Sequence, residues 1–128
     1  MRALLDTHVF LWWITDDRRL SQRVRRLFRD PRNELLLSAA SAWEIAIKAR
    51  AGDLKIEGDV GNFVREHLAA NAIGVLPVQL DHALGVATLP RYHGDPFDRL
   101  IVAQSQAEKL PIVTGDKMIR RYAVEVLW

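Results

Sequence analysis

Residues 93–104 read HGDPFDRLIVAQ and predict the start of a central amphipathic helix. Asp95 is a good N-cap, because its carboxylate can accept hydrogen bonds from free backbone N–H groups, and Pro96 suits the first helical position. The apolar residues that follow give this helix a broad buried face. Asp98 stands in its first turn, where a carboxylate either serves the helix dipole or points into a shared pocket.

Length and composition bound the class of protein. The chain has 128 residues, of which 49% are hydrophobic and 27% charged, which is typical of one folded domain over 1–128. The absence of cysteine excludes disulfides and thiolate chemistry. The first apolar run is too short for a signal peptide, and no stretch reaches the roughly 18–20 apolar residues of a membrane span. We therefore expect a cytoplasmic protein without membrane contact.

Short apolar strands alternate with helices along the whole chain. This alternation predicts a single α/β domain with a parallel sheet covered by helices on both faces, a Rossmann-like sandwich. The strands are expected at 2–5, 35–37, 73–78, 111–114 and 123–127. The main helices are expected at 7–14, 21–30, 38–52, 60–71, 80–88 and 95–109, with Ser38 or Ser41 as the cap of the third.

Four acids lie at or inside apolar stretches: Asp6, Glu44, Asp98 and Asp116. Asp6 and Asp116 follow strands, and ligands of parallel sheets bind beyond the carboxyl ends of the strands, so both should lie on one rim. Buried carboxylates are costly and repel one another unless a cation neutralises them. Oxygen ligands without histidine or cysteine favour Mg²⁺ or Mn²⁺, which suits phosphodiester cleavage.

Each of these acids also has a purely structural interpretation. Asp6 and Asp116 could cap strand-to-helix turns, and Asp98 could serve only its helix dipole. Glu44 could form a surface ion pair with Lys48, which would remove a ligand from the site. Asp95 is assigned to the N-cap first and to the site second. One shared site explains four acids at the same edge of the sheet better than four unrelated structural roles do.

Hydroxyl groups near the acids could orient a carboxylate or a bound water. Thr7 and Thr114 are the candidates for this role, whereas Ser41 is expected to cap its helix instead. The four histidines, His8, His67, His82 and His93, show no metal-ligand spacing and are expected to serve packing or the surface.

Arginines are concentrated between residues 18 and 32, although the net charge is only +2. Arg18, Arg19, Arg23 and Arg26 could bind RNA or a protein partner, because guanidinium groups suit phosphates and carboxylates alike. A solvated helix face explains the same pattern equally well.

Taken together, the motifs resemble those of the PIN-domain family, and in particular its VapC-type toxin ribonucleases of bacterial toxin–antitoxin systems. The resemblance rests on LLDTH at 4–8, SAWEIAIK at 41–48, LP at 89–90 with His93, DPFDR at 95–99 and TGD at 114–116. It implies RNA cleavage at an Mg²⁺ or Mn²⁺ site formed by Asp6, Glu44, Asp98 and Asp116. It also implies a homodimer and inhibition by a VapB-type antitoxin.

Two other classes stay open from the residues alone. A phosphotransfer or signalling domain is disfavoured, because His8 stands where an aspartyl phosphatase has its second Asp, and Leu5-Asp6 is not the acid pair of a receiver domain. A non-catalytic module would bind RNA or protein through the arginines without any metal-dependent cleavage.

Overall fold

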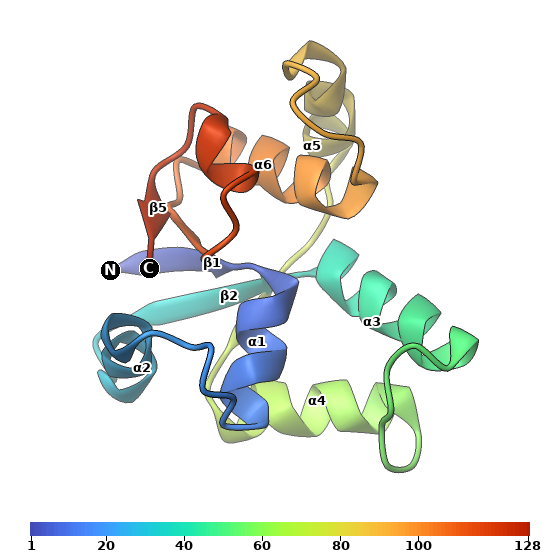
Figure 1. Ribbon diagram of the computed structural model, residues 1–128. Coiled ribbons are helices and arrows are strands. Elements are labelled where there is room, and N and C mark those ends of the chain that lie inside the picture. The colour runs from blue at the N-terminus through green and yellow to red at the C-terminus, as the bar shows by residue number, and fades with distance from the viewer.

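The computed structural model describes all residues, 1–128, and contains one parallel sheet of five strands in the order β3-β2-β1-β4-β5 (Figure 1). The strands are β1 (Arg2–Leu5), β2 (Glu34–Ser38), β3 (Gly74–Leu76), β4 (Ile112–Val113) and β5 (Val126–Leu127). All four strand pairings are parallel. The predicted α/β architecture is therefore confirmed.

Helices cover both faces of this sheet. They are α1 (Thr7–Ile14), α2 (Gln22–Arg29), α3 (Ala39–Ala51), α4 (Val60–Ala70), α5 (Leu80–Gly85) and α6 (Pro96–Glu108), with short 3-10 turns at Val86–Thr88 and Ile119–Arg121. In Figure 1, α1, α2 and α4 lie below the sheet and α5 and α6 above it, while α3 continues beyond the end of β2. None of these helices is long and apolar enough to cross a membrane.

Alternating side chains of the central strands fill two separate cores. Leu5 and Leu37 point into the core beneath α1, whereas Leu4 and Leu36 point into the core beneath α6. Successive side chains of a strand face opposite sides of the sheet, so both faces of β1 and β2 are apolar. Because β1 is packed on both faces, its orientation is fixed, and so is the position of Asp6, which follows its carboxyl end.

The three strands β3, β4 and β5 are shorter than the sequence predicts. The expected strand at 73–78 is reduced to Gly74–Leu76, because Pro77 has no N–H to donate to the sheet. A Cβ on Gly74 would lie 2.8 Å from Leu36 Cδ2, so the close contact with β2 requires glycine there. The expected strands at 111–114 and 123–127 are likewise reduced to two residues each, β4 and β5.

The sequence predicts the N-cap residues of two helices beside the carboxyl edge of the sheet, and one of these predictions is confirmed while the other is wrong. Asp95 caps α6 as predicted: its Oδ1 accepts hydrogen bonds from the N–H groups of Phe97 and Asp98 at 2.9 and 3.1 Å. The expectation that Ser41 caps α3 is wrong. Ser38 is the N-cap and accepts from the N–H of Ala40 at 3.0 Å, which places Ser41 inside the first turn.

Candidate active site

Asp6 is the most constrained of the four acids. It follows β1 and is 3% exposed, and its Oδ2 accepts a hydrogen bond from Thr114 Oγ1 at 2.7 Å. Asp6 occupies the N-cap position of α1 but makes no side-chain cap bond, so the cap interpretation is wrong for its carboxylate. Its other oxygen, Oδ1, is buried without a hydrogen-bond partner. Burial raises the pKa of Asp6, and the charge of Asp116 adds to this effect.

Asp98 lies in the first turn of α6, as the sequence predicts, and is 9% exposed. Its pKa is raised to about 8, first by burial and then by the negative charges of Asp6, Asp95, Asp116 and Glu44. A carboxyl group feels such charges strongly only when they are near. The structure therefore brings the four predicted acids, with Asp95, into one electrostatic cluster.

Glu44 both pairs with Lys48 and belongs to this cluster. Lys48 Nζ lies 2.8 Å from Glu44 Oε2, as the ion-pair interpretation predicts, and the bond raises the pKa of Lys48. The pair is not a surface pair, however, because the Glu44 side chain is only 4% exposed. Lys48 also feels the charges of Asp95 and Asp98, so it is a cation at the margin of the acids.

Asp116 combines a turn role with a place in the cluster. Its Oδ1 accepts from the N–H of Met118 at 2.8 Å, which is the capping role that the sequence offered as an alternative. Its own N–H donates to Thr114 Oγ1 at 3.0 Å. Thr114 thus ties Asp6 and Asp116 together at the carboxyl ends of β1 and β4.

The two threonine candidates differ in what they contact. Thr114 orients Asp6, as described above. Thr7 donates instead to Ser41 Oγ at 2.8 Å, in a buried bond between the first turns of α1 and α3. No carboxylate accepts from Thr7, so its hydroxyl positions the helix that carries Glu44 rather than an acid directly.

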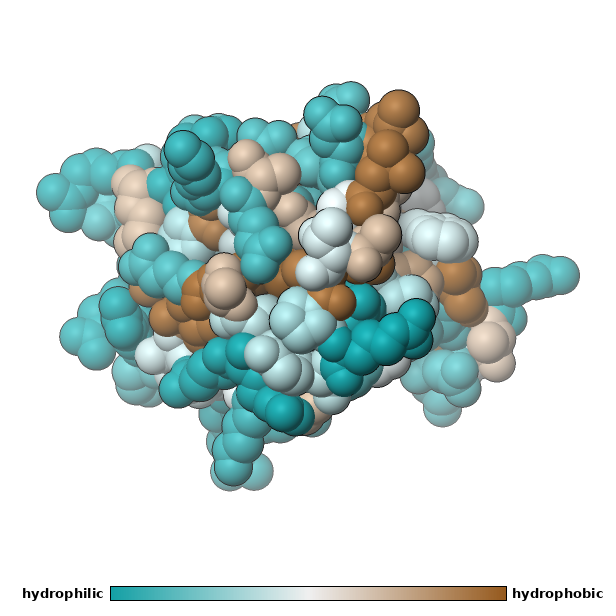
Figure 2. Space-filling model, turned by 90° about the horizontal axis from the view of Figure 1, so that it is seen from above, coloured by the Kyte–Doolittle hydropathy of each residue, from teal (hydrophilic) through white to brown (hydrophobic).

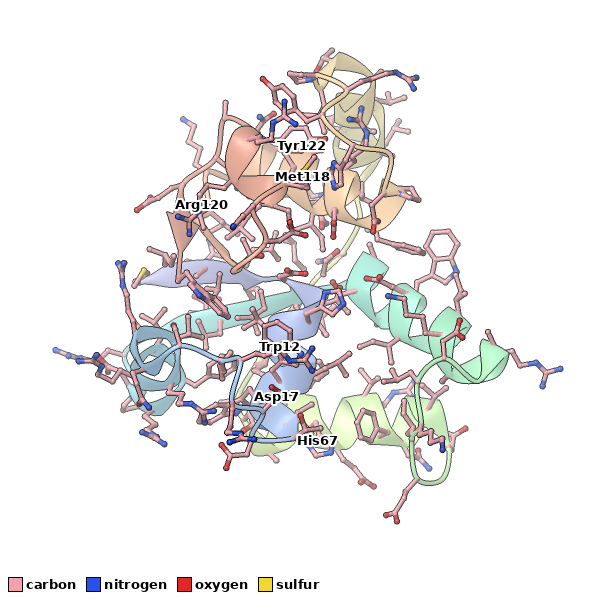
Figure 3. The ribbon with its side chains drawn as sticks, viewed as in Figure 1. Trp12, Asp17, His67, Met118, Arg120 and Tyr122 are labelled. Carbon is pink, nitrogen blue, oxygen red and sulfur yellow. The ribbon has the colours of Figure 1, made fainter.

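Sequence reasoning missed the contact between His93 and Asp98. His93 Nε2 lies 3.2 Å from Asp98 Oδ2, and His93 Nδ1 lies 2.8 Å from the Tyr122 hydroxyl. Arg99 donates to the same hydroxyl at 3.1 Å. Figure 3 shows Tyr122 above the sheet. His93 lies only five positions before Asp98, but its ring also contacts Tyr122, which lies 29 positions away, and no local pattern in the sequence indicates that contact.

Only one of the predicted basic residues lies at the cluster. Arg19 lines a cavity together with Asp6, Asp116 and two tryptophans. Arg23 and Arg26 are exposed on α2, which Figure 1 places at the opposite end of the sheet from α3. Arg18 is exposed in the loop before α2 and does not line this cavity.

The donor set fits a hard divalent cation. The cluster offers carboxylate oxygens, among them Asp6 Oδ1, which accepts no hydrogen bond. Burial, with a smaller contribution from mutual repulsion, raises the pKa values of Asp6 and Asp98, and a bound cation would favour their charged forms. In this structure no three His, Asp or Glu side chains are already arranged around one ion position. Of the four acids, Asp6 and Asp116 line the neighbouring cavity, and the cluster does not form a closed coordination shell.

Comparison with known proteins finds one consistent group. A family model described as "PIN domain" matches residues 3–125. Ribonuclease VapC22 of Mycobacterium tuberculosis is 30% identical over 123 residues, which cover 94% of this chain and 91% of that protein. VapBC2 from Rickettsia felis, bound to a promoter DNA fragment, superimposes with a TM-score of 0.74 at 15% identity, covering 100% of this chain and 99% of the other. DNA-bound VapBC from Salmonella typhimurium gives 0.72 at 16% identity, covering 99% and 97%.

Proposed function

Because this chain belongs to the PIN-domain family, we propose that it is an endoribonuclease that hydrolyses RNA phosphodiester bonds with Mg²⁺ or Mn²⁺. The relative that matches this chain over nearly its whole length is named a ribonuclease, which supports RNA as the substrate. We propose that residues 1–128 act as one PIN domain in the cytoplasm, where such RNA is found.

The observation that carries this proposal is the buried carboxylate cluster. Burial first, and then the negative charges of the neighbouring acids, raise the pKa of Asp98 to about 8. Lys48 neutralises only Glu44 directly, at 2.8 Å. A structural ion-pair network would have a close cation for each acid, whereas Asp6 Oδ1 accepts no hydrogen bond and has only the exposed His8 Nδ1, 3.9 Å away, as an ionic neighbour. Such perturbed groups beside a cavity are typical of a functional site.

Asp6, Glu44, Asp98 and Asp116 are the residues that would hold the cation. When bound, the cation would activate a water molecule and stabilise the charge of the phosphate. The chain's own contribution is positioning. Thr114 holds the Asp6 carboxylate, and His93 holds that of Asp98.

We also propose two protein partners. The family membership favours a VapB-type antitoxin, with this chain as the toxin of the pair. A homodimer is supported by an exposed apolar strip on α5 and just before it, formed by Val78, Leu80 and Leu84, whose exposed fractions are 39%, 72% and 61%. Figure 2 views the molecule from above and shows hydrophobic groups reaching the surface among hydrophilic ones. Such strips mark sites of protein association.

A cleavage assay tests the proposed activity. Purified protein is incubated with single-stranded RNA and Mn²⁺, with EDTA as the metal-free control. We expect cleavage by the wild type and a loss of at least about 100-fold in Asp98→Asn and in Asp6→Asn. Asp81→Asn, in the first turn of α5 and exposed, is the matched control and should cleave normally. RNA binding without cleavage in any protein would favour the non-catalytic binding module.

A further inference from the structure

A cavity of about 350 Å³ opens beside the acid cluster, and its other walls are aromatic and basic. Its lining residues are Asp6, His8, Trp12, Arg19, Gly115, Asp116 and Trp128. Figure 3 shows Trp12 and Asp17 below the sheet, on the opposite side from Met118 and Tyr122. The proposed cation site uses the acids of this cavity but leaves its aromatic walls without a role.

The two indole rings form an angled aromatic surface. The ring centroids of Trp12 and Trp128 are 6.1 Å apart, with an angle of 63° between the planes. Both rings are half-buried, so neither is simply a core side chain. Gly115 makes this geometry possible, because a Cβ there would lie 2.7 Å from the Trp128 ring. The glycine beside Asp116 therefore lets an indole approach the carboxylate rim.

Arg19 adds a positive charge at the mouth of the cavity. Its guanidinium lies 4.6 Å from the centroid of the Trp12 ring. Asp17 holds it in place through two side-chain hydrogen bonds of 2.7 and 3.0 Å, and the Arg19 side chain is still 67% exposed. This is a fixed cation with donors free to meet a ligand.

We propose that this cavity binds a nucleobase of single-stranded RNA, next to the phosphodiester that lies at the carboxylates. The inference rests on the proposed ribonuclease function and adds the position of a base-binding subsite. Indole rings stack on any base, and an arginine on an aromatic ring contributes a cationic surface for a base or its phosphate. Bases in a duplex are already stacked on one another, so the subsite selects unpaired nucleotides.

Binding without cleavage tests this subsite separately from catalysis. A short, unstructured, fluorescein-labelled oligoribonucleotide is titrated in EDTA at low ionic strength and followed by fluorescence anisotropy. Arg19→Ala and Trp12→Leu are each expected to weaken binding by about 5- to 100-fold, which is the range for one stacked base. Thermal unfolding checks that Trp12→Leu is folded, whereas Arg19 is too exposed for its replacement to threaten the fold.

Each variant has a matched control. Arg32 forms the same kind of pair with Asp30 as Arg19 does with Asp17, at 2.8 Å, but does not line the cavity. Trp43 is 61% exposed and also lies outside the cavity. Arg32→Ala and Trp43→Leu should therefore change binding by less than about twofold.

The outcomes separate the subsite from the catalytic proposal. Wild-type affinity in both cavity variants, equal losses in the controls, or no binding by the wild type would overturn the subsite. Equal effects on a duplex of the same sequence would also overturn it, because paired bases cannot enter. RNA cleavage that depends on Asp98 would still stand in each case. RNA binding that depends on Arg19 and Trp12, without any RNA cleavage, would support the subsite and contradict the proposed ribonuclease activity.

Discussion

The hydroxyl of Thr114 donates a hydrogen bond of 2.7 Å to Asp6 Oδ2, although the two residues lie 108 positions apart in the sequence. The parallel pairing of β1 with β4 creates this contact. Leu5 is in register with Val113, so the residues that follow them, Asp6 and Thr114, lie side by side at the same edge of the sheet. The sheet thus sets the orientation of an acid that is, with Glu44, the most buried of the cluster.

Thr114→Val tests this contact, because valine keeps the shape and removes the hydroxyl. Hydrogen bonds to charged groups contribute about 1.5–3 kcal/mol, and Asp116 loses an acceptor for its N–H as well. We expect the free energy of unfolding, measured in urea at neutral pH, to fall by about 1–3 kcal/mol. Thr88→Val is the control, since the Thr88 hydroxyl bonds Gly85 O at an exposed position. Equal losses in the free energy of unfolding of the two variants would show that the hydrogen bond to Asp6 contributes no more to stability than an exposed one.

The stability of the cation-free protein should depend on the protonation of Asp98. Its pKa is 3.8 in a reference peptide and about 8 in the folded protein, so the folded state binds the proton more tightly. The stabilisation is therefore complete below about pH 4 and is lost as the pH rises towards 8. We expect the free energy of unfolding to fall over this range by on the order of a few kcal/mol.

Asp98→Asn should flatten this pH profile, and Asp81→Asn should leave it unchanged. Chemical unfolding at several pH values in EDTA measures both slopes. The same pH dependence of stability in wild type and Asp98→Asn between pH 4 and 8 would contradict the assignment of a raised pKa to Asp98.

Lys48→Met should tighten cation binding while weakening the fold. Lys48 bonds Glu44 at 2.8 Å and adds positive charge near Asp95 and Asp98. Its removal leaves the buried carboxylate of Glu44 for a divalent cation, so Mn²⁺ affinity should rise several-fold and stability in EDTA should fall by about 1–3 kcal/mol. Free Mn²⁺ is measured by electron paramagnetic resonance, with the exposed Lys55→Met as the control. An unchanged affinity would leave Glu44 as an ion-pair residue only.

Leu84→Asp should convert the proposed homodimer into a monomer. Leu84 is 61% exposed on α5, next to Leu80 at 72%, and a charge there would have to be buried at an apolar interface. Light scattering coupled to size-exclusion chromatography gives the mass. Leu84→Met keeps the apolar surface and should remain dimeric. A monomeric wild type would contradict the proposed dimer.

The fold was predictable because local pattern and tertiary structure agree. Both faces of β1 and β2 are buried, so these strands read as short apolar runs between helices. The strands β4 and β5 were less predictable. β4 and β5 are two residues long, and their pairing depends on neighbours rather than on their own sequence.

The grouping of the acids was predictable from topology, but their partners were not. Parallel strands bring Asp6 and Asp116 to one edge, whichever side chains surround them. The contacts of His93 with Tyr122 and of Arg19 with Trp12 depend on loops whose course no local pattern encodes. Ser41 was assigned wrongly because serines three positions apart compete for one cap, and Ser38 wins when β2 ends there.

The central claim is that Asp6, Glu44, Asp98 and Asp116 hold a divalent cation. Anomalous X-ray diffraction from crystals soaked in MnCl₂ tests it most directly, because it locates manganese without reference to activity. We predict an anomalous peak among these carboxylates in the wild type, within the roughly 2.0–2.2 Å coordination distances of small divalent ions, and its loss in Asp98→Asn. Manganese found only elsewhere, or no peak at a concentration that supports RNA cleavage, would contradict the claim.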